Sequence, residues 1–170
     1  MKKTIWLVAL ASLLCSLFMV SCESEKSEPK KTRREILIEK QKEQREVEKL
    51  KQSQSKFMDS FSKEWNKMPY KKIGLLELRD YKKDTVRFAF IFNRKPAGLG
   101  EIKKITREAA KLALKILVEQ GRRPAEEWLS LFVWAEKPEI GETGKKLMRI
   151  YGRTFYDFNT DSLKWVPLKN

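Results

Sequence analysis

The sequence predicts an α+β fold: an antiparallel sheet of about five strands, one long helix packed on a face of it, and a charged helix before it. Two observations support this prediction. Apolar residues alternate in several short segments between residues 72 and 166, which is typical of strands. Between residues 101 and 120 they recur every three or four positions, which is typical of a helix. The element order favours a meander of neighbouring strands with one helical crossover.

A charged helix is predicted over residues 35–67, which contain no Gly or Pro and are rich in Glu, Lys, Gln and Arg. Residues 39–46 lack apolar side chains, so this part should be solvated. Further along, we expect Phe57, Phe61 and Trp65 to pack against the following domain. A short coiled coil, in which the helix pairs with another helix, is the alternative, although clean heptads are few.

The domain after this helix, predicted over residues 68–170, begins with a hairpin. Residues 72–79 and 85–92 are predicted strands, and a polar turn joins them. In the second strand every other residue from Val86 to Phe92 is large and apolar. Side chains alternate between the two faces of a strand, so this face should be buried.

The rest of the domain combines one helix with three strands. The helix over residues 101–120 presents one apolar face and is followed by Gly121, which favours a helix end. Residues 128–135 are almost all apolar, which suits a central strand covered on both faces. Further strands are predicted over residues 146–157 and 163–166, with a polar turn between them.

The N-terminal segment has the composition of an export signal. Lys2 and Lys3 precede an uncharged run over residues 5–20. Crossing a bilayer takes about 20 apolar residues, so this run matches the apolar core of a signal peptide better than a membrane span. The run ends at Cys22, after which the sequence becomes polar. This segment resembles the signal of bacterial lipoproteins, in which an aliphatic residue and two small residues precede an invariant cysteine; here Met19 stands where leucine is usual.

The resemblance implies that residues 1–21 are a signal peptide and that Cys22 is acylated and begins the mature chain. Two or more acyl chains hold a protein stably on a membrane. We therefore expect a lipid-anchored protein facing the periplasm or the exterior, and Glu23 favours the outer membrane if the cell is Gram-negative. An uncleaved anchor helix, or a secretory signal cut near Ser21, is the alternative. Residues 22–34 are polar and predict a flexible tether.

Charge predicts the kind of partner. Residues 68–170 hold 22 basic and 13 acidic residues, whereas residues 23–67 hold 13 and 10. The positive charge therefore belongs to the domain, which makes an anionic partner plausible: phospholipid head groups, lipopolysaccharide phosphates, a cell-wall polymer or an acidic protein. An unpatterned basic surface that only maintains solubility is the alternative.

Alternation along the strand at residues 146–157 places arginines and aromatic residues on one face. Guanidinium and aromatic groups in a row bind phosphates and stack on flat surfaces. Packing between neighbouring strands on the solvent side is the alternative. The candidate face for an anionic ligand consists of Arg79, Arg87, Arg149, Tyr151 and Arg153.

Several kinds of chemistry lack their residues. The chain contains no histidine and only two cysteines, which excludes histidine-based triads, histidine metal sites and a disulfide framework. The loop at residues 141–146 lacks the first glycine and the hydroxyl residue of a phosphate-binding loop. The acids at Glu126, Glu127, Glu136, Glu139 and Glu142 suggest solvated side chains more than a catalytic pair. We expect no catalytic residue, metal, cofactor, small-molecule substrate or nucleic-acid partner.

The sequence thus predicts a non-catalytic binding or assembly module of the bacterial envelope, which engages a protein or an anionic polymer. An inhibitor or exclusion factor that acts on an envelope-attacking enzyme is the alternative. A small cell-wall enzyme is a third hypothesis, which turnover of cell-wall fragments would support.

Overall fold

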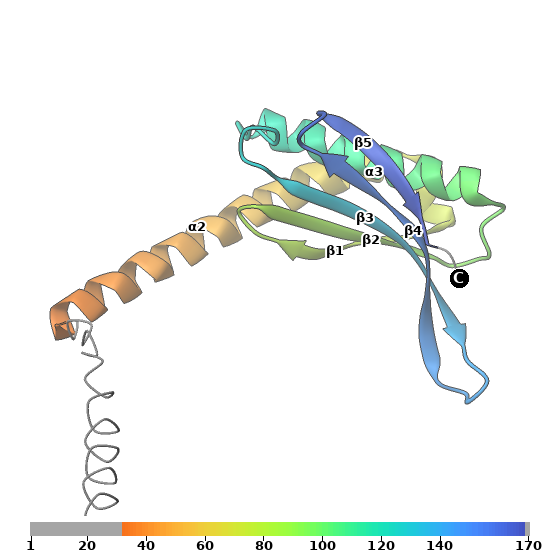
Figure 1. Ribbon diagram of the computed structural model, residues 1–170, viewed down its shortest axis with the longest axis horizontal. Helices are drawn as coiled ribbons and strands as arrows, with labels where there is room; N and C mark the ends of the chain where they lie inside the picture. Colours follow the sequence, from red (N-terminus) through yellow and green to blue (C-terminus); the bar gives the residue numbers. More distant parts are fainter. Residues whose placement is uncertain (1–31, 169–170) are drawn as a thin grey trace, which may run out of the picture. The chain divides into compact units, whose positions relative to one another are not determined.

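The computed structural model describes residues 32–168. The predicted signal peptide, Cys22 with its expected acylation, and most of the predicted tether at 22–34 lie outside the described residues. In the described part no helix has both the length and the apolar character that a membrane span requires. The elements in chain order are α2 (Arg33–Trp65), η1 (Pro69–Lys72), β1 (Gly74–Tyr81), β2 (Thr85–Phe92), α3 (Leu99–Glu119), β3 (Ser130–Ile140), β4 (Lys146–Asp157) and β5 (Ser162–Pro167) (Figure 1).

Contacts within the chain divide it into two compact units, Met1–Lys42 and Glu43–Asn170, so that helix α2 belongs to both. The described part of the first unit is helical and exposed. Its helix begins with a reciprocal cap: the Thr32 N–H donates to Glu35 Oε2 at 2.7 Å, and the Glu35 N–H donates to Thr32 Oγ1 at 3.4 Å. The bond from the Thr32 backbone N–H, and then the Thr32 hydroxyl, lower the pKa of the Glu35 carboxyl group. The pair satisfies backbone donors that a helix start leaves free.

The second unit includes the end of α2, which packs on the sheet as predicted. Phe57 and Phe61 are buried, with 0% and 2% exposure. The Phe57 ring lies 5.3 Å from that of Tyr81 and 6.0 Å from that of Phe88, and the Phe61 ring stacks on Phe88 at 4.8 Å. Trp65, on the last turn, meets Phe90 edge-on. The helix therefore contributes to the core of the domain.

The five strands form one sheet in the order β1-β2-β3-β4-β5. The predicted α+β class, with about five strands and a long helix packed on the sheet, is confirmed. The sheet is mixed, however, and not wholly antiparallel, because β2 and β3 run parallel. The reason is the crossover: α3 carries the chain back along the sheet between β2 and β3, so both strands start from the same end.

Both helices cover one face of this sheet. The apolar side of α3 packs against β3, β4 and β5, and the end of α2 packs against β1 and β2 (Figure 1). Inside this layer the Thr106 and Thr154 hydroxyls form a hydrogen bond of 2.7 Å, and Thr106 also donates to the Ile102 carbonyl. The core therefore has its buried polar groups paired.

Strand β3 differs from the prediction in three ways. It continues to Ile140, beyond the predicted end at residue 135. It begins at Ser130, because Trp128 has a left-handed backbone (φ 54°) that ends the preceding turn. It is also buried on one face only. Leu131 and Val133 are fully buried, whereas Phe132 and Trp134 between them are half-buried on the other face. The strand is central in the sheet but is covered by helix on one side.

Candidate functional site

The face of the sheet opposite the helices carries aromatic and cationic side chains together. Phe132 and Trp134 on β3 pair across the sheet with Phe155 and Arg153 on β4. Arg87 on β2 pairs with Phe132 from the other side. On each of the three strands, the residues that alternate with these five are buried under the helices. The five side chains therefore point away from the helices. We call these five residues the open-face cluster.

Arg153 lies at the centre of the open-face cluster. Its guanidinium carbon is 5.0 Å from the ring centroid of Trp134, 5.3 Å from that of Phe132 and 5.9 Å from that of Phe155. Arg87 lies 6.0 Å from the same Phe132 ring. Within residues 32–168, neither arginine forms an ion pair or a side-chain hydrogen bond. Two guanidinium groups therefore share one aromatic ring, and their N–H donors are free for an external acceptor.

Arg79, another residue of the predicted face, lies close to two carboxylates. Its guanidinium is 3.1 Å from Glu77 and 3.6 Å from Glu136. It sits at an irregularity of β1, between Leu78 and Asp80. Two nearby carboxylates compensate its charge, so Arg79 adds no free cation to the open-face cluster.

Arg149 and Tyr151 are separated from Arg153 by a bulge in β4. Ala135 pairs with Gly152 and Glu136 pairs with Ile150, so Tyr151 has no partner on β3. Its ring packs edge-on against the buried Phe92, at 6.2 Å. The expectation that Arg149, Tyr151 and Arg153 share one face is therefore wrong, because an extra residue reverses the alternation.

Arg149 lies 3.7 Å from Glu139 and 5.6 Å from the Tyr151 ring, away from the open-face cluster. The sequence signal for the bulge is Gly152. A Cβ there would lie 2.6 Å from the Val166 carbonyl oxygen and 2.7 Å from the Trp165 ring. A glycine inside a strand indicates such a close approach or a bulge.

Phe132 and Trp134 were not among the predicted site residues. They alternate with the buried residues of β3, and this alternation was the available signal. The nearly continuous apolar run was instead interpreted as a strand covered on both sides. Their role is visible only once β3 lies beside β4.

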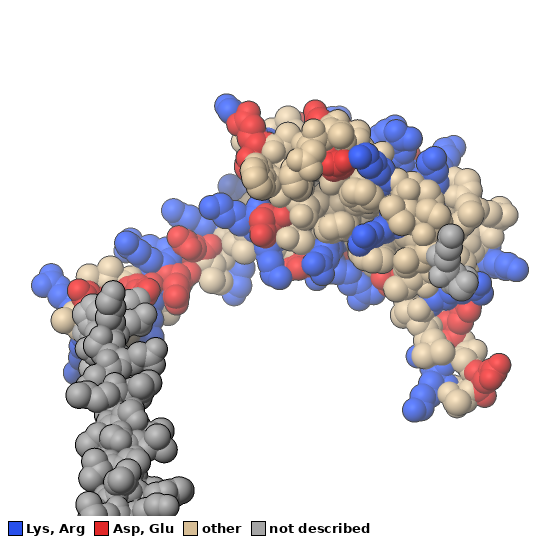
Figure 2. All heavy atoms as spheres, in the orientation of Figure 1, with Lys and Arg blue, Asp and Glu red and all other residues tan. Residues whose placement is uncertain are grey.

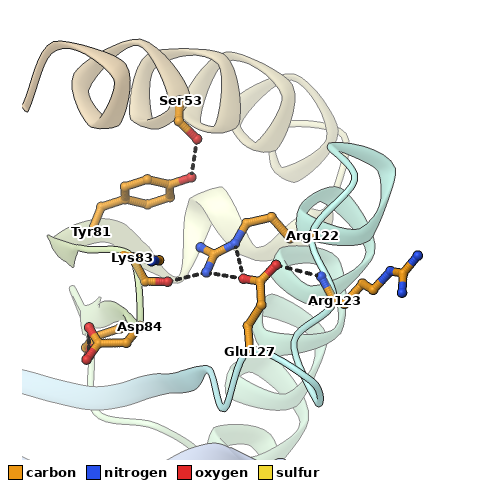
Figure 3. A network of polar contacts seen from close by, with 8 residues as sticks. Ser53, Tyr81, Lys83, Asp84, Arg122, Arg123 and Glu127 are labelled. Carbon is orange, nitrogen blue, oxygen red and sulfur yellow. Dashed lines mark hydrogen bonds and ion pairs between the residues drawn. The ribbon is translucent and has the colours of Figure 1, made fainter. Parts of the chain in front are cut away.

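A groove of about 740 Å³ lies between the second half of α2, the β1–β2 turn and the segment after α3. Figure 3 shows the polar groups around it. Ser53 and Tyr81 share a hydrogen bond of 2.9 Å, and Arg122 bonds Glu127 at 2.6 and 2.8 Å. Arg122 also donates to the Lys83 carbonyl.

The Arg122–Glu127 pair ties the segment after α3 to the β1–β2 turn. A backbone N–H bond from Arg123, together with the Arg122 guanidinium, lowers the pKa of Glu127. Ser53 bonds Tyr81 and Arg122 bonds Glu127, while Lys49 and Lys83 also line the groove. The paired groups of this network therefore stabilise the fold.

The carboxylates considered for catalysis mostly form ion pairs. Glu126 contacts Arg123 at 3.1 Å, and Glu127, Glu136 and Glu139 also have basic partners. Among residues 32–168 no group of acidic or sulfur side chains is arranged to hold a metal ion. Burial, and then a hydrogen bond to Asp161, raise the pKa of Tyr156 to about 12, so its phenol stays protonated at neutral pH.

Basic side chains do not gather in one patch on the face of the domain that Figure 2 shows. Figure 2 shows Lys and Arg side chains spread across the face in view, with Asp and Glu among them. The open-face cluster is distinguished by its aromatic neighbours and by two arginines that form no ion pair within residues 32–168, and not by charge alone. Comparison with protein-family models, curated proteins and solved structures finds no match to this chain.

Proposed function

We propose that this chain is a lipid-anchored, non-catalytic binding module of the bacterial envelope, whose open-face cluster holds an anionic group of a polymer or protein partner. The observation that carries the proposal is the arrangement of Arg87 and Arg153, two unpaired guanidinium groups over one ring, Phe132. The anchor rests on the resemblance of residues 1–22 to a lipoprotein signal.

The physical argument starts from the repulsion between like charges. Two cations held near one another repel, and a carboxylate nearby normally compensates them, as it does at Arg79. At the open-face cluster the aromatic rings provide part of this compensation, at about 0.5–2 kcal/mol for each contact. A phosphate or carboxylate from outside would complete it through charge-assisted, bidentate hydrogen bonds. The rings beside the arginines add a flat surface for sugar or aromatic groups.

The test is a charge-neutralising pair of substitutions, Arg87→Gln and Arg153→Gln, in the full chain. Binding to lipopolysaccharide and to purified cell-wall polymer is measured by co-sedimentation at several salt concentrations. Hydrogen bonds to charged groups contribute about 1.5–3 kcal/mol, so each substitution should weaken binding roughly tenfold or more. The salt dependence of binding should also decrease.

The matched control is Arg107→Gln, since Arg107 is exposed on α3 and outside the open-face cluster. It removes the same charge and should change binding far less. Equal binding of the open-face variants and the unsubstituted protein would refute the proposed face. Equal weakening by all three substitutions would show that only net charge matters.

The anchor has its own test. Cells that express the chain are labelled with a fatty-acid analogue, and the mature N-terminus is determined by mass spectrometry. We expect acyl groups on Cys22 and loss of both labelling and membrane retention in Cys22→Ala. A mature chain without fatty acid would refute the anchor.

A further inference from the structure

Strands β3 and β4 continue beyond the rest of the sheet as a two-stranded arm, which we define as residues 137–150. Pairing with β2 ends at Glu136, and pairing with β5 begins at Gly152. Within these limits the two strands pair only with each other. Figure 1 shows the arm extending past the ends of β1, β2 and β5. A hairpin of this kind is marginally stable alone, so the adjoining sheet holds it in place.

The tip of the arm is a tight turn. The Gly141 N–H donates to the Lys145 carbonyl at 2.9 Å, and the Gly144 N–H donates to the Gly141 carbonyl at the same distance. Gly144 has a left-handed backbone (φ 72°), which glycine adopts without strain. The backbone of the tip is therefore held in a closed turn.

Large apolar side chains are exposed on both faces of the arm. Ile140 is 77% exposed, Leu147 58% and Met148 44%. Ile140 pairs with Lys146 and Met148 pairs with Pro138, which places these two apolar residues on one face. Leu147 lies between Lys146 and Met148 on β4 and pairs with Glu139. Because side chains alternate along a strand, Leu147 points to the other face. No single flat partner surface would cover both sides.

Basic residues surround this apolar tip. Lys145 and Lys146 lie beside the turn and form no ion pair within residues 32–168. Further from the tip, Lys137 and Arg149 each lie 3.7 Å from the same carboxylate, Glu139. The arm carries four basic residues against two acidic ones, so its charge is complementary to an anionic surface.

We propose that the arm enters the headgroup region of an anionic lipid bilayer. A bilayer surrounds an inserted tip on both sides, which matches apolar residues on both faces, and its anionic headgroups match the lysines beside the turn. The unpaired backbone edges of the two strands limit the insertion to the depth that water and headgroups reach. The inference rests on the proposed lipid anchor, which would keep the domain within reach of a leaflet.

The experiment uses the acylated full chain, reconstituted in phosphatidylcholine vesicles with or without phosphatidylglycerol. An environment-sensitive fluorophore is attached at the tip through Thr143→Cys, or through Asn159→Cys in the exposed β4–β5 turn as a control. We expect a blue-shifted emission and quenching by nitroxide-labelled lipids for the label at 143 in phosphatidylglycerol vesicles. The label at 159 should keep the emission of a water-exposed fluorophore and should not be quenched.

Substitutions then separate apolar contact from charge. Leu147→Ser should reduce the ratio of inserted to free arms about tenfold, and neutralising Lys145 or Lys146 should reduce it about fivefold each. The matched control is Leu75→Ser. Leu75 lies on β1 and is 60% exposed, against 58% for Leu147. This substitution should leave the ratio of inserted to free arms unchanged.

An unshifted emission at position 143, in chains that mass spectrometry shows to be acylated and vesicle-bound, would overturn the proposal. An equal decrease in the ratio of inserted to free arms with Leu147→Ser and Leu75→Ser would also overturn it. Chains that lack acyl groups and do not stay on the vesicles would instead refute the anchor, because the two readouts are separate.

Discussion

Removal of the Phe57 side chain tests whether the end of α2 belongs to the core of the domain. Phe57 is fully buried, and its ring lies within 6.0 Å of the rings of Phe61, Tyr81 and Phe88. Truncating a buried phenylalanine to alanine costs about 3–5 kcal/mol, through lost transfer free energy and the cavity that remains. We expect a loss at the upper end of this range, because aromatic pairs add about 0.5–1.5 kcal/mol beyond burial.

The assay is urea unfolding of Phe57→Ala, followed by tryptophan fluorescence and circular dichroism, with Val47→Ala as the control. Val47 lies on the same helix and is 51% exposed, so its truncation should change the free energy of unfolding by less than about 0.5 kcal/mol. A small loss for Phe57→Ala, similar to the control, would refute the packing. A loss that depends on protein concentration would favour the coiled-coil alternative, in which the helix pairs with another chain.

Three further predictions follow from the core and the bulge. Thr106→Val should destabilise the fold by about 1–3 kcal/mol, because the Thr154 hydroxyl loses its partner; Thr154→Val should cost less, because Thr106 still donates to a backbone carbonyl, and chemical unfolding measures the difference. Gly152→Ala should cost about 1–3 kcal/mol from overpacking, whereas Gly100→Ala, where a Cβ meets nothing within 4 Å, should leave the unfolding midpoint unchanged or raise it. The Tyr156 pKa of about 12 exceeds its usual value near 10, so folding favours the neutral phenol; the stability that it contributes is complete below about pH 10 and is lost as the pH rises towards 12, which tyrosinate absorbance and alkaline unfolding measure.

Local patterns predicted most of the elements. The alternation from Val86 to Phe92 located β2 and its buried face, and the three-to-four spacing located α3 within about two residues at each end. The spacing of Phe57, Phe61 and Trp65 predicted docking of α2. These predictions were successful because hydrophobic periodicity depends only on neighbours along the chain.

The candidate site was predicted only in part. Arg87 and Arg153 lie in the open-face cluster, but the bulge at Tyr151 and Gly152 moves Arg149 and Tyr151 out of it. The bulge depends on a residue of the neighbouring strand, because the Trp165 ring of β5 packs against Gly152. Alternation along β4 by itself could not reveal the change of face.

The sequence by itself determined the α+β class, the approximate positions of most strands and helices, the basic balance of the domain and the resemblance of its first 22 residues to a lipoprotein signal. Only the tertiary structure decided that β2 and β3 are parallel, that Phe132 and Trp134 join Arg153, and that residues 137–150 stand apart as an arm. The physical reason is that periodicity and composition are local properties. Residues far apart in the chain, which meet only in the folded sheet, determine strand direction and register. They also determine which side chains surround a charged group.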